Sequence, residues 1–191
     1  MKKLLTLVIV LLLLAILSAV LVPRIYNAVQ TQLYPLPDKY RPTVEKYAKE
    51  YNIPIEILCA IINTESSFDP NATSHAGAMG MMQITSDTFE WLQFRSGEHH
   101  NTEDLYDYDT NIKYGAFFLS LLYEEFGDWD TVFAAYNAGR GRVNGWLADE
   151  RYSKDGKLTD IPIKETANYI KKVNNAIKKY QKLYFSFNTT E

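Results

Sequence analysis

The chain opens on an unbroken apolar segment. Residues Leu4 to Val22 carry no charge, and their polar side chains are limited to Thr6 and Ser18. A helix of that length rises about 28 Å, close to the roughly 30 Å thickness of the hydrocarbon core of a bilayer. We therefore expect residues 1–22 to form one N-terminal transmembrane helix.

The charges beside this segment predict its orientation. Lys2, Lys3 and the amino terminus precede it, and only Arg24 follows closely. Because basic residues are kept in the cytoplasm, the rest of the chain should lie on the extracytoplasmic side of a single-pass protein. A cleaved signal peptide is the alternative. Both interpretations place the remaining residues outside the cytosol.

Beyond this segment the pattern of apolar positions is helical. Residues 23–38 contain Pro35 and Pro37 and show no clear period, so we expect a stalk or linker there. Residues 39–185 would form one domain, whose predicted helices show apolar side chains at three-and-four spacing and in which no alternating strand pattern appears. Residues 186–191 would form a C-terminal tail. The predicted helices cover approximately 42–51, 54–66, 85–92, 109–127, 132–139 and 162–181, with a loop over 96–108. The domain should be mostly α.

Composition limits the class of protein. Hydrophobic residues make up 47% of the 191 residues, which is enough for a substantial core, and the net charge of −3 gives no general attraction to nucleic acid. The single cysteine, Cys59, excludes an internal disulfide and lies in the mostly apolar run 55–62. We expect it to be a small buried side chain rather than a reactive thiol.

Glu65 is the first candidate for chemistry. It follows Ile61 by four positions and Leu58 by seven, so on a helix it shares their apolar face. Burial makes a carboxylate costly to ionise and raises its pKa, which lets the group donate a proton near neutral pH. The alternative is a frayed helix end, with Glu65 exposed or capping the following loop.

The residues around Glu65 favour a catalytic role. Residues 65–83, ESSFDPNATSHAGAMGMMQ, closely resemble the signature of bacterial lytic transglycosylases with a soluble-lytic-transglycosylase (SLT) domain, which are relatives of goose-type lysozyme. Residues 135–139, AYNAG, resemble the second motif of that family, and Pro162 with Glu165, Thr166 and Tyr169 resembles the third. The similarity covers roughly residues 40 to 182. Without it, the glycines and methionines of the first motif would be taken as turn and core residues.

The resemblance implies a lysozyme-like helical fold with a cleft for a glycan strand. It also implies that Glu65 is the catalytic acid/base and that Ser74 and Gln83 line the sugar site. Tyr136 would face the reacting saccharide and Asn137 would lie among the substrate-binding residues. Glu165 would be a buried second glutamate that supports the site.

The same resemblance implies a reaction. Glu65 alone would cleave the bond between N-acetylmuramic acid and N-acetylglucosamine in peptidoglycan, leaving a 1,6-anhydro sugar end. A muramidase that uses water, as lysozyme does, and a non-catalytic scaffold domain that binds the cell wall are the alternatives. Such a protein would act at the bacterial cell membrane, with glycan strands as its partner and no nucleic acid.

No cofactor or metal is expected. Asp107, Asp109 and Asn111 have the opening spacing of a calcium-binding EF-hand loop, but Ile112 and Phe118 occupy the positions that need glycine and glutamate. The three histidines have no partner spacing that favours a metal site.

Overall fold

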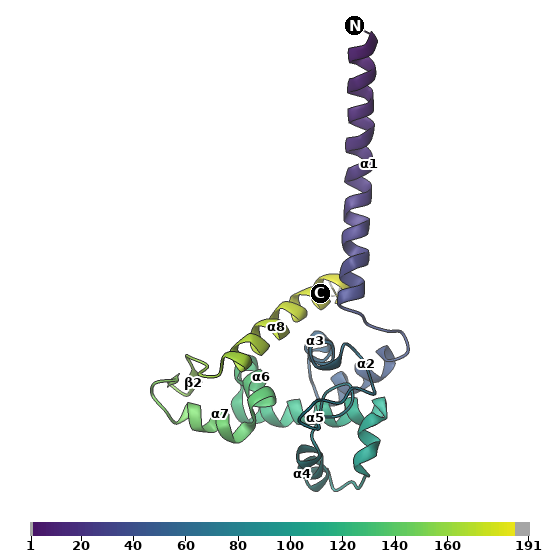
Figure 1. Ribbon diagram of the computed structural model, residues 1–191. Coiled ribbons are helices and arrows are strands. Elements are labelled where there is room, and N and C mark those ends of the chain that lie inside the picture. The colour runs from purple at the N-terminus through teal and green to yellow at the C-terminus, as the bar shows by residue number, and fades with distance from the viewer. Residues whose placement is uncertain (1, 186–191) are drawn as a thin grey trace. The chain divides into compact units, whose positions relative to one another are not determined.

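The computed structural model describes residues 2–185, which divide into two compact units, one ending at Pro35 and the other beginning at Leu36. The first unit is helix α1, Lys2–Leu33 (Figure 1). Among the described residues, the part of α1 over Ile9–Leu33 is the one helix long and apolar enough to cross a membrane, by length and composition alone. A signal sequence near the N-terminus passes the same test.

Helix α1 runs through Pro23, so the expectation of an irregular stalk is wrong for residues 23–33. Proline removes its own hydrogen bond and crowds the carbonyl four residues before it, but in this long helix the turns on both sides remain helical. Ile25, Val29 and Leu33 continue the four-residue spacing of an apolar helix face, which the later prolines obscure. Only residues 34–38 lack helical structure in this segment.

The second unit is mostly helical, as predicted. Its two-residue strands β1 (Ser153–Lys154) and β2 (Lys157–Leu158) pair antiparallel, η1 (Thr102–Tyr106) is a 3-10 helix, and η2 (Gln181–Phe185) is a π-helical turn. The α-helices are α2 (Arg41–Glu50), α3 (Ile55–Ser66), α4 (Ser86–Ser96), α5 (Tyr108–Phe126), α6 (Trp129–Ala138), α7 (Arg140–Leu147) and α8 (Lys164–Tyr180). The predicted tail, 186–191, lies outside the described residues.

Three local elements differ from the sequence prediction. Asp107, rather than Asp109, caps α5, because its side chain accepts a hydrogen bond from the backbone N of Thr110 at 2.9 Å. Helix α7 was not predicted, since Gly139 ends α6 and the next helix starts at once. The β1–β2 hairpin was also missed, although its turn residues Asp155 and Gly156, with φ of 51° and 75°, are typical of such turns.

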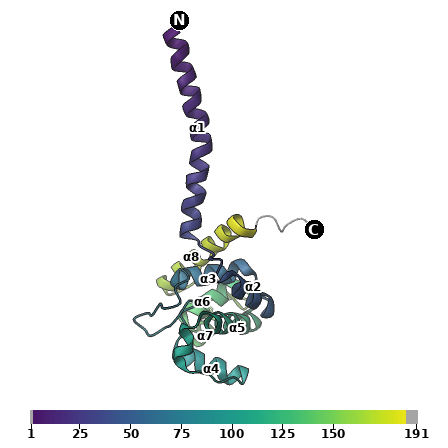
Figure 2. The same cartoon turned by 90° about the vertical axis from the view of Figure 1, so that its right-hand side faces the viewer.

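Helix α3 is deeply buried in this unit. It packs against α2 and α8 (Figure 1 and Figure 2). Every residue from Ile57 to Ile62 is at most 5% exposed, including Cys59, as predicted. A helix that is apolar on all sides is stable only in a core. The chain leaves α3 through Ser67 and Phe68, whose φ values of 56° and 66° are left-handed, and this sharp exit leaves Glu65 at the end of a buried helix.

Candidate active site

Glu65 lies in the last turn of α3 and is half-buried. The hydroxyl of Tyr169, on α8, donates a hydrogen bond of 2.5 Å to its carboxylate oxygen Oε1. Burial raises the pKa of Glu65 to about 7, and the Tyr169 hydrogen bond, which favours the charged form, lowers it in part. The desolvation expected from the sequence is therefore present, and the frayed and exposed alternative is wrong.

An open pocket of about 470 Å³ adjoins this carboxyl group. Its wall is built from the end of α3, the end of α6 and residues 165–175 of α8, so three helices far apart in the sequence meet there. The lining residues are Thr64, Glu65, Asn137, Glu165, Asn168, Tyr169, Lys171, Lys172 and Asn175. Of the candidates from the sequence, the pocket brings together Glu65, Asn137 and Glu165.

Asn137 and Glu165 occupy the exposed side of this pocket. Asn137 is held in place because its Oδ1 accepts a hydrogen bond of 2.8 Å from the hydroxyl of Thr166. Glu165 is exposed in the first turn of α8. The expectation of a buried second glutamate is therefore wrong: the first turn of α8 turns Thr166 toward the interior and Glu165 toward solvent.

The negative charge of Glu65 affects the pKa of Tyr136, but Tyr136 lines a different pocket. Its hydroxyl donates a hydrogen bond of 2.7 Å to the backbone oxygen of Met82, and its ring packs on Phe118 with centroids 5.2 Å apart. Burial, followed by the negative charge of Glu65, raises the pKa of Tyr136 well above its ordinary value, so the phenol stays neutral. The pocket that it lines, of about 330 Å³, also includes Trp91 and Arg140.

The loop over residues 70–84 is fixed by one buried side chain, Asn111 on α5. The Oδ1 of Asn111 accepts a bond of 2.7 Å from the backbone N of Met82, and its Nδ2 donates to the carbonyls of Met79 (3.0 Å) and Leu105 (2.8 Å). A Cβ atom at Gly80, where φ is +74°, would lie only 2.2 Å from that Nδ2. The glycine is therefore required by both its backbone angle and this close approach.

Ser74 and Gln83 belong to this loop and line neither of the two pockets just described. The hydroxyl of Ser74 accepts a hydrogen bond of 3.0 Å from the backbone N of Ala78. The Nε2 of Gln83 donates to the carbonyls of Ala72 at 3.2 Å and Gly80 at 2.9 Å. Both side chains therefore stabilise the loop through hydrogen bonds to its own backbone.

Sequence reasoning missed the functions of two residues. Tyr169 was noted only as part of a motif, although it directly contacts Glu65. Its position four residues after Glu165 gives no sign of that contact. Asn111 was considered for a calcium loop and as part of a helix that resembles one in the family, but it was given no role of its own, yet it is fully buried and organises residues 70–84. The sequence did carry a signal for this role, because Asn111 is a polar side chain next to Ile112 on a helix of apolar pattern. A buried amide needs hydrogen-bond partners, so such a residue is a candidate for holding a neighbouring segment.

Comparison with known proteins identifies relatives over most of the second unit. The family model described as Transglycosylase SLT domain matches residues 42–159. The chain is 34% identical over 143 residues to the soluble lytic murein transglycosylase of Escherichia coli (strain K12). This match covers 72% of this chain and 22% of that protein. It is 30% identical over 184 residues to the membrane-bound lytic murein transglycosylase C of Haemophilus influenzae (strain PittGG), covering 84% and 50%.

A solved structure gives the same result. The lytic transglycosylase Slt of Pseudomonas aeruginosa, determined as an inactive variant with glutamate replaced by glutamine, superposes with a TM-score of 0.70 at 33% identity. The match covers 80% of this chain and 25% of that one, so this chain spans half or less of these relatives. The lysozyme-like helical fold expected from the sequence is confirmed. The chain belongs to the family of proteins with a transglycosylase SLT domain.

Proposed function

We propose that this protein is a peptidoglycan lytic transglycosylase. It would cleave the β-1,4 bond between N-acetylmuramic acid and N-acetylglucosamine and leave a 1,6-anhydromuramic end. The observation that carries the proposal is the carboxyl group of Glu65, with a pKa of about 7, at the wall of an open pocket. Near neutral pH such a group is present in both protonation states, so one residue can donate a proton and later accept one.

The two proton transfers involve the same carboxyl group. Protonated Glu65 gives its proton to the glycosidic oxygen as the bond from that oxygen to C1 of the muramic acid breaks, and N-acetylglucosamine leaves as an alcohol. The carboxylate then removes the proton of the muramic acid 6-hydroxyl, whose oxygen forms the new bond to C1. Glu65 ends protonated, and no water is consumed. The nucleophile is part of the substrate, which lowers the entropic part of the barrier.

The surrounding residues have distinct parts in this proposal. Asn137 and Glu165 present polar groups to the glycan from the exposed side of the pocket. Tyr136, as a neutral phenol, would face the saccharide from the pocket that it lines with Trp91 and Arg140. Ser74 and Gln83 contribute to substrate binding by holding the loop in shape, because the Ser74 hydroxyl and the Gln83 amide nitrogen are both engaged within it.

We also propose that α1 anchors the protein in the bacterial cell membrane, with the second unit on the extracytoplasmic side. The apolar stretch Ile9–Leu33 and the similarity to proteins named membrane-bound lytic murein transglycosylase C support this proposal. Full-length protein should be recovered in the membrane fraction and be accessible to protease in wall-stripped cells. A shortened soluble form beginning near Pro23 would instead favour a cleaved signal peptide.

The decisive experiment on the reaction identifies the ends of the fragments that the protein releases from purified peptidoglycan. Mass spectrometry should find 1,6-anhydromuramic ends, which are lighter than hydrolytic ends by one water. Predominantly reducing muramic ends would show a lysozyme-type hydrolase instead. Binding without release, by a protein shown to be folded, would favour the scaffold alternative.

A further inference from the structure

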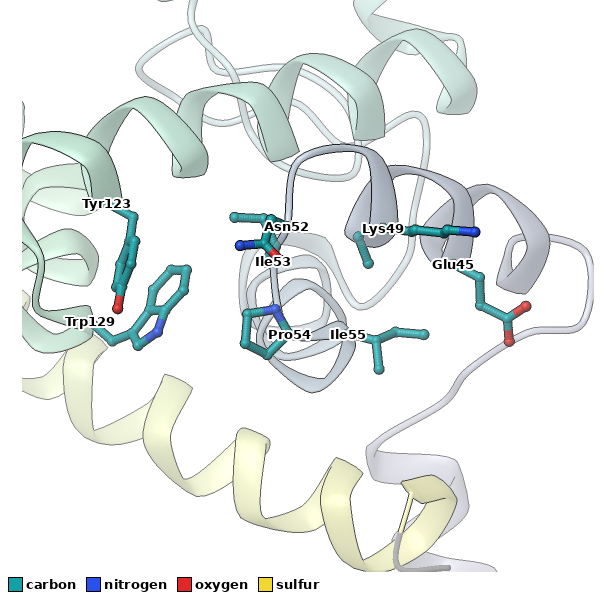
Figure 3. Close-up of a pocket in the computed structure, with 9 residues that line it drawn as sticks. Glu45, Lys49, Asn52, Ile53, Pro54, Ile55, Tyr123 and Trp129 are labelled. Carbon is teal, nitrogen blue, oxygen red and sulfur yellow. The ribbon is translucent and has the colours of Figure 1, made fainter. Parts of the chain in front are cut away.

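A second pocket, of about 580 Å³, shares no lining residue with the pocket of Glu65. It lies between the end of α2, the turn into α3, and the junction of α5 and α6 (Figure 3). This size is in the range of small-molecule and sugar sites. Nothing in the mechanism proposed above uses it.

A pair of stacked aromatic rings forms one end of this pocket. Tyr123 is 41% exposed, and its ring lies 4.4 Å from the ring of Trp129 at an interplanar angle of 26°. Trp129 in turn stacks on the buried Phe133, with centroids 5.8 Å apart and planes at 27°. Tyr123 is exposed and Trp129 is half-buried, and each ring already packs against another ring, so a ligand that binds there does not have to order them first.

The rest of the pocket changes from apolar to polar along its length. Pro54 and Ile55 lie between the aromatic rings and the side chains of Lys49 and Glu45, and Asn52 borders the same space (Figure 3). Asn52 has a left-handed φ of 53°, a conformation that asparagine tolerates, and its side chain is exposed. Together these groups offer an amide, an ammonium and a carboxylate beside an apolar floor.

We propose that this pocket is a second binding site for N-acetylated glycan strands. A pyranose ring has an apolar C–H face that stacks on aromatic rings, and an edge of hydroxyl and acetamido groups that needs donors and acceptors. The pocket offers both, with the exposed ring of Tyr123 and the half-buried ring of Trp129 at one end and Lys49, Glu45 and Asn52 at the polar border.

The proposal rests on the proposed function in one respect: the glycan bound there is taken to be the polymer that Glu65 cleaves. Holding one strand at two points raises the local concentration of uncut substrate at the catalytic pocket. The second site would therefore matter for long, insoluble peptidoglycan and not for short soluble strands.

The test uses the full chain carrying Glu65→Gln, so that no substrate is consumed, and a tetramer of N-acetylglucosamine as the probe. The indole N–H signal of Trp129, one of three tryptophans, is identified in an NMR spectrum by its loss in Trp129→Phe. We expect this signal to move on titration. We also expect Trp129→Ala and Tyr123→Ala to weaken binding of soluble, peptide-free glycan strands about five- to tenfold, as removal of an aromatic anchor does.

Two controls accompany these variants. Trp129→Phe keeps a flat ring and should retain most of the affinity. Phe94→Ala removes a phenylalanine that is 85% exposed on α4 and lines none of the pockets described above, so it should change nothing. With Glu65 restored, Trp129→Ala should slow the release of fragments from whole peptidoglycan while leaving cleavage of short soluble strands at the rate of the parent protein.

An unmoved Trp129 signal, or unchanged affinity in Tyr123→Ala and Trp129→Ala, would overturn the second site. Movement of the signal with free stem peptides but not with the tetramer would overturn it in favour of a peptide site. Tyr123→Ala carries the test if Trp129→Ala does not fold. Failure of the proposed function would look different, since cleavage would be absent in the parent protein while the binding measurements keep their meaning.

Discussion

The loop over residues 70–84 and helix α8 flank Glu65 in different ways. The loop is held by hydrogen bonds to α5 and within itself: Asn111 on α5 binds Met82 and Met79, while Ser74 and Gln83 bond to the backbone of the loop. The pocket-facing side of α8 is open. Tyr169 and Thr166 make the contacts to Glu65 and Asn137, and Glu165, Lys171 and Lys172 are exposed beside them.

This difference separates two kinds of motif residue. The side chains of the loop over residues 70–84 hold the backbone in its shape, so substituting them should affect stability more than ligand binding. Exposed residues of α8 do not hold the backbone in this way, so they can interact with a ligand. Glu65 stands between the two classes, because it is half-buried, pays a desolvation cost and holds a single hydrogen bond to Tyr169. The following variants test this division.

Glu65→Gln should give the largest effect on activity. The amide keeps the size of the side chain and can still accept the Tyr169 hydrogen bond, but it can neither donate nor take up the proton. Loss of a general acid typically costs about 10²- to 10⁴-fold in rate. Release of soluble fragments from peptidoglycan measures the rate, and a thermal melt checks the fold. Fragment release at the parent rate by a folded variant would remove Glu65 from the mechanism.

Asn111→Ala should give the largest effect on stability. It leaves the amide of Met82 and the carbonyl of Leu105 without this partner in a buried place, while the carbonyl of Met79 keeps its bond from the backbone N of Ile84. We expect a loss of about 3 kcal/mol or more in the free energy of unfolding, measured by denaturant titration. Asn71→Ala, at an exposed position of the same loop, is the matched control and should change little. Equal effects of the two variants would contradict the division between loop and helix.

Tyr169→Phe should change the pH dependence of the reaction. The hydroxyl of Tyr169 favours the ionised form of Glu65, so its removal raises the pKa of Glu65 above about 7. Since the first step needs the protonated acid, the alkaline limb of the rate profile should move upward by about half a unit to one unit. Tyr152→Phe, outside the site, should leave the profile in place. A downward movement in Tyr169→Phe would mean that the hydrogen bond has the opposite sense.

Glu165→Gln should have the smallest effect on stability. A buried glutamate would lose partners on this change, whereas the exposed Glu165 has solvent as its surroundings. We expect the free energy of unfolding to change by less than about 0.5 kcal/mol, as for other surface substitutions. Urea titration of the two proteins in parallel measures the difference. A destabilisation near that of Asn111→Ala would restore the interpretation of Glu165 as a structural partner.

The helices and Glu65 could be predicted because the information for them is local. The three-and-four spacing of Leu58, Ile61 and Glu65 places the carboxyl group on an apolar face wherever the helix packs. The bond between Tyr169 and Glu65 joins residues 104 positions apart, and no local pattern reports it. The burial of Glu165 was expected from family resemblance alone. Glu165 is exposed instead, because the first turn of α8 points Thr166 toward the interior. Gly139 looked like a terminus, but it joins two helices directly.

The contacts of Asn111 also constrain how residues 70–84 move. The backbone amide of Met82 is bonded to a side chain 29 positions away, on a helix whose neighbouring residues are buried. Deuterium from solvent can reach that amide only after the bond to α5 breaks. The exchange rate of Met82 should therefore follow the separation of this loop from α5, and not the fast rate of a surface loop. At Met82, this segment without regular secondary structure should therefore exchange its amide hydrogen as slowly as residues of the core do.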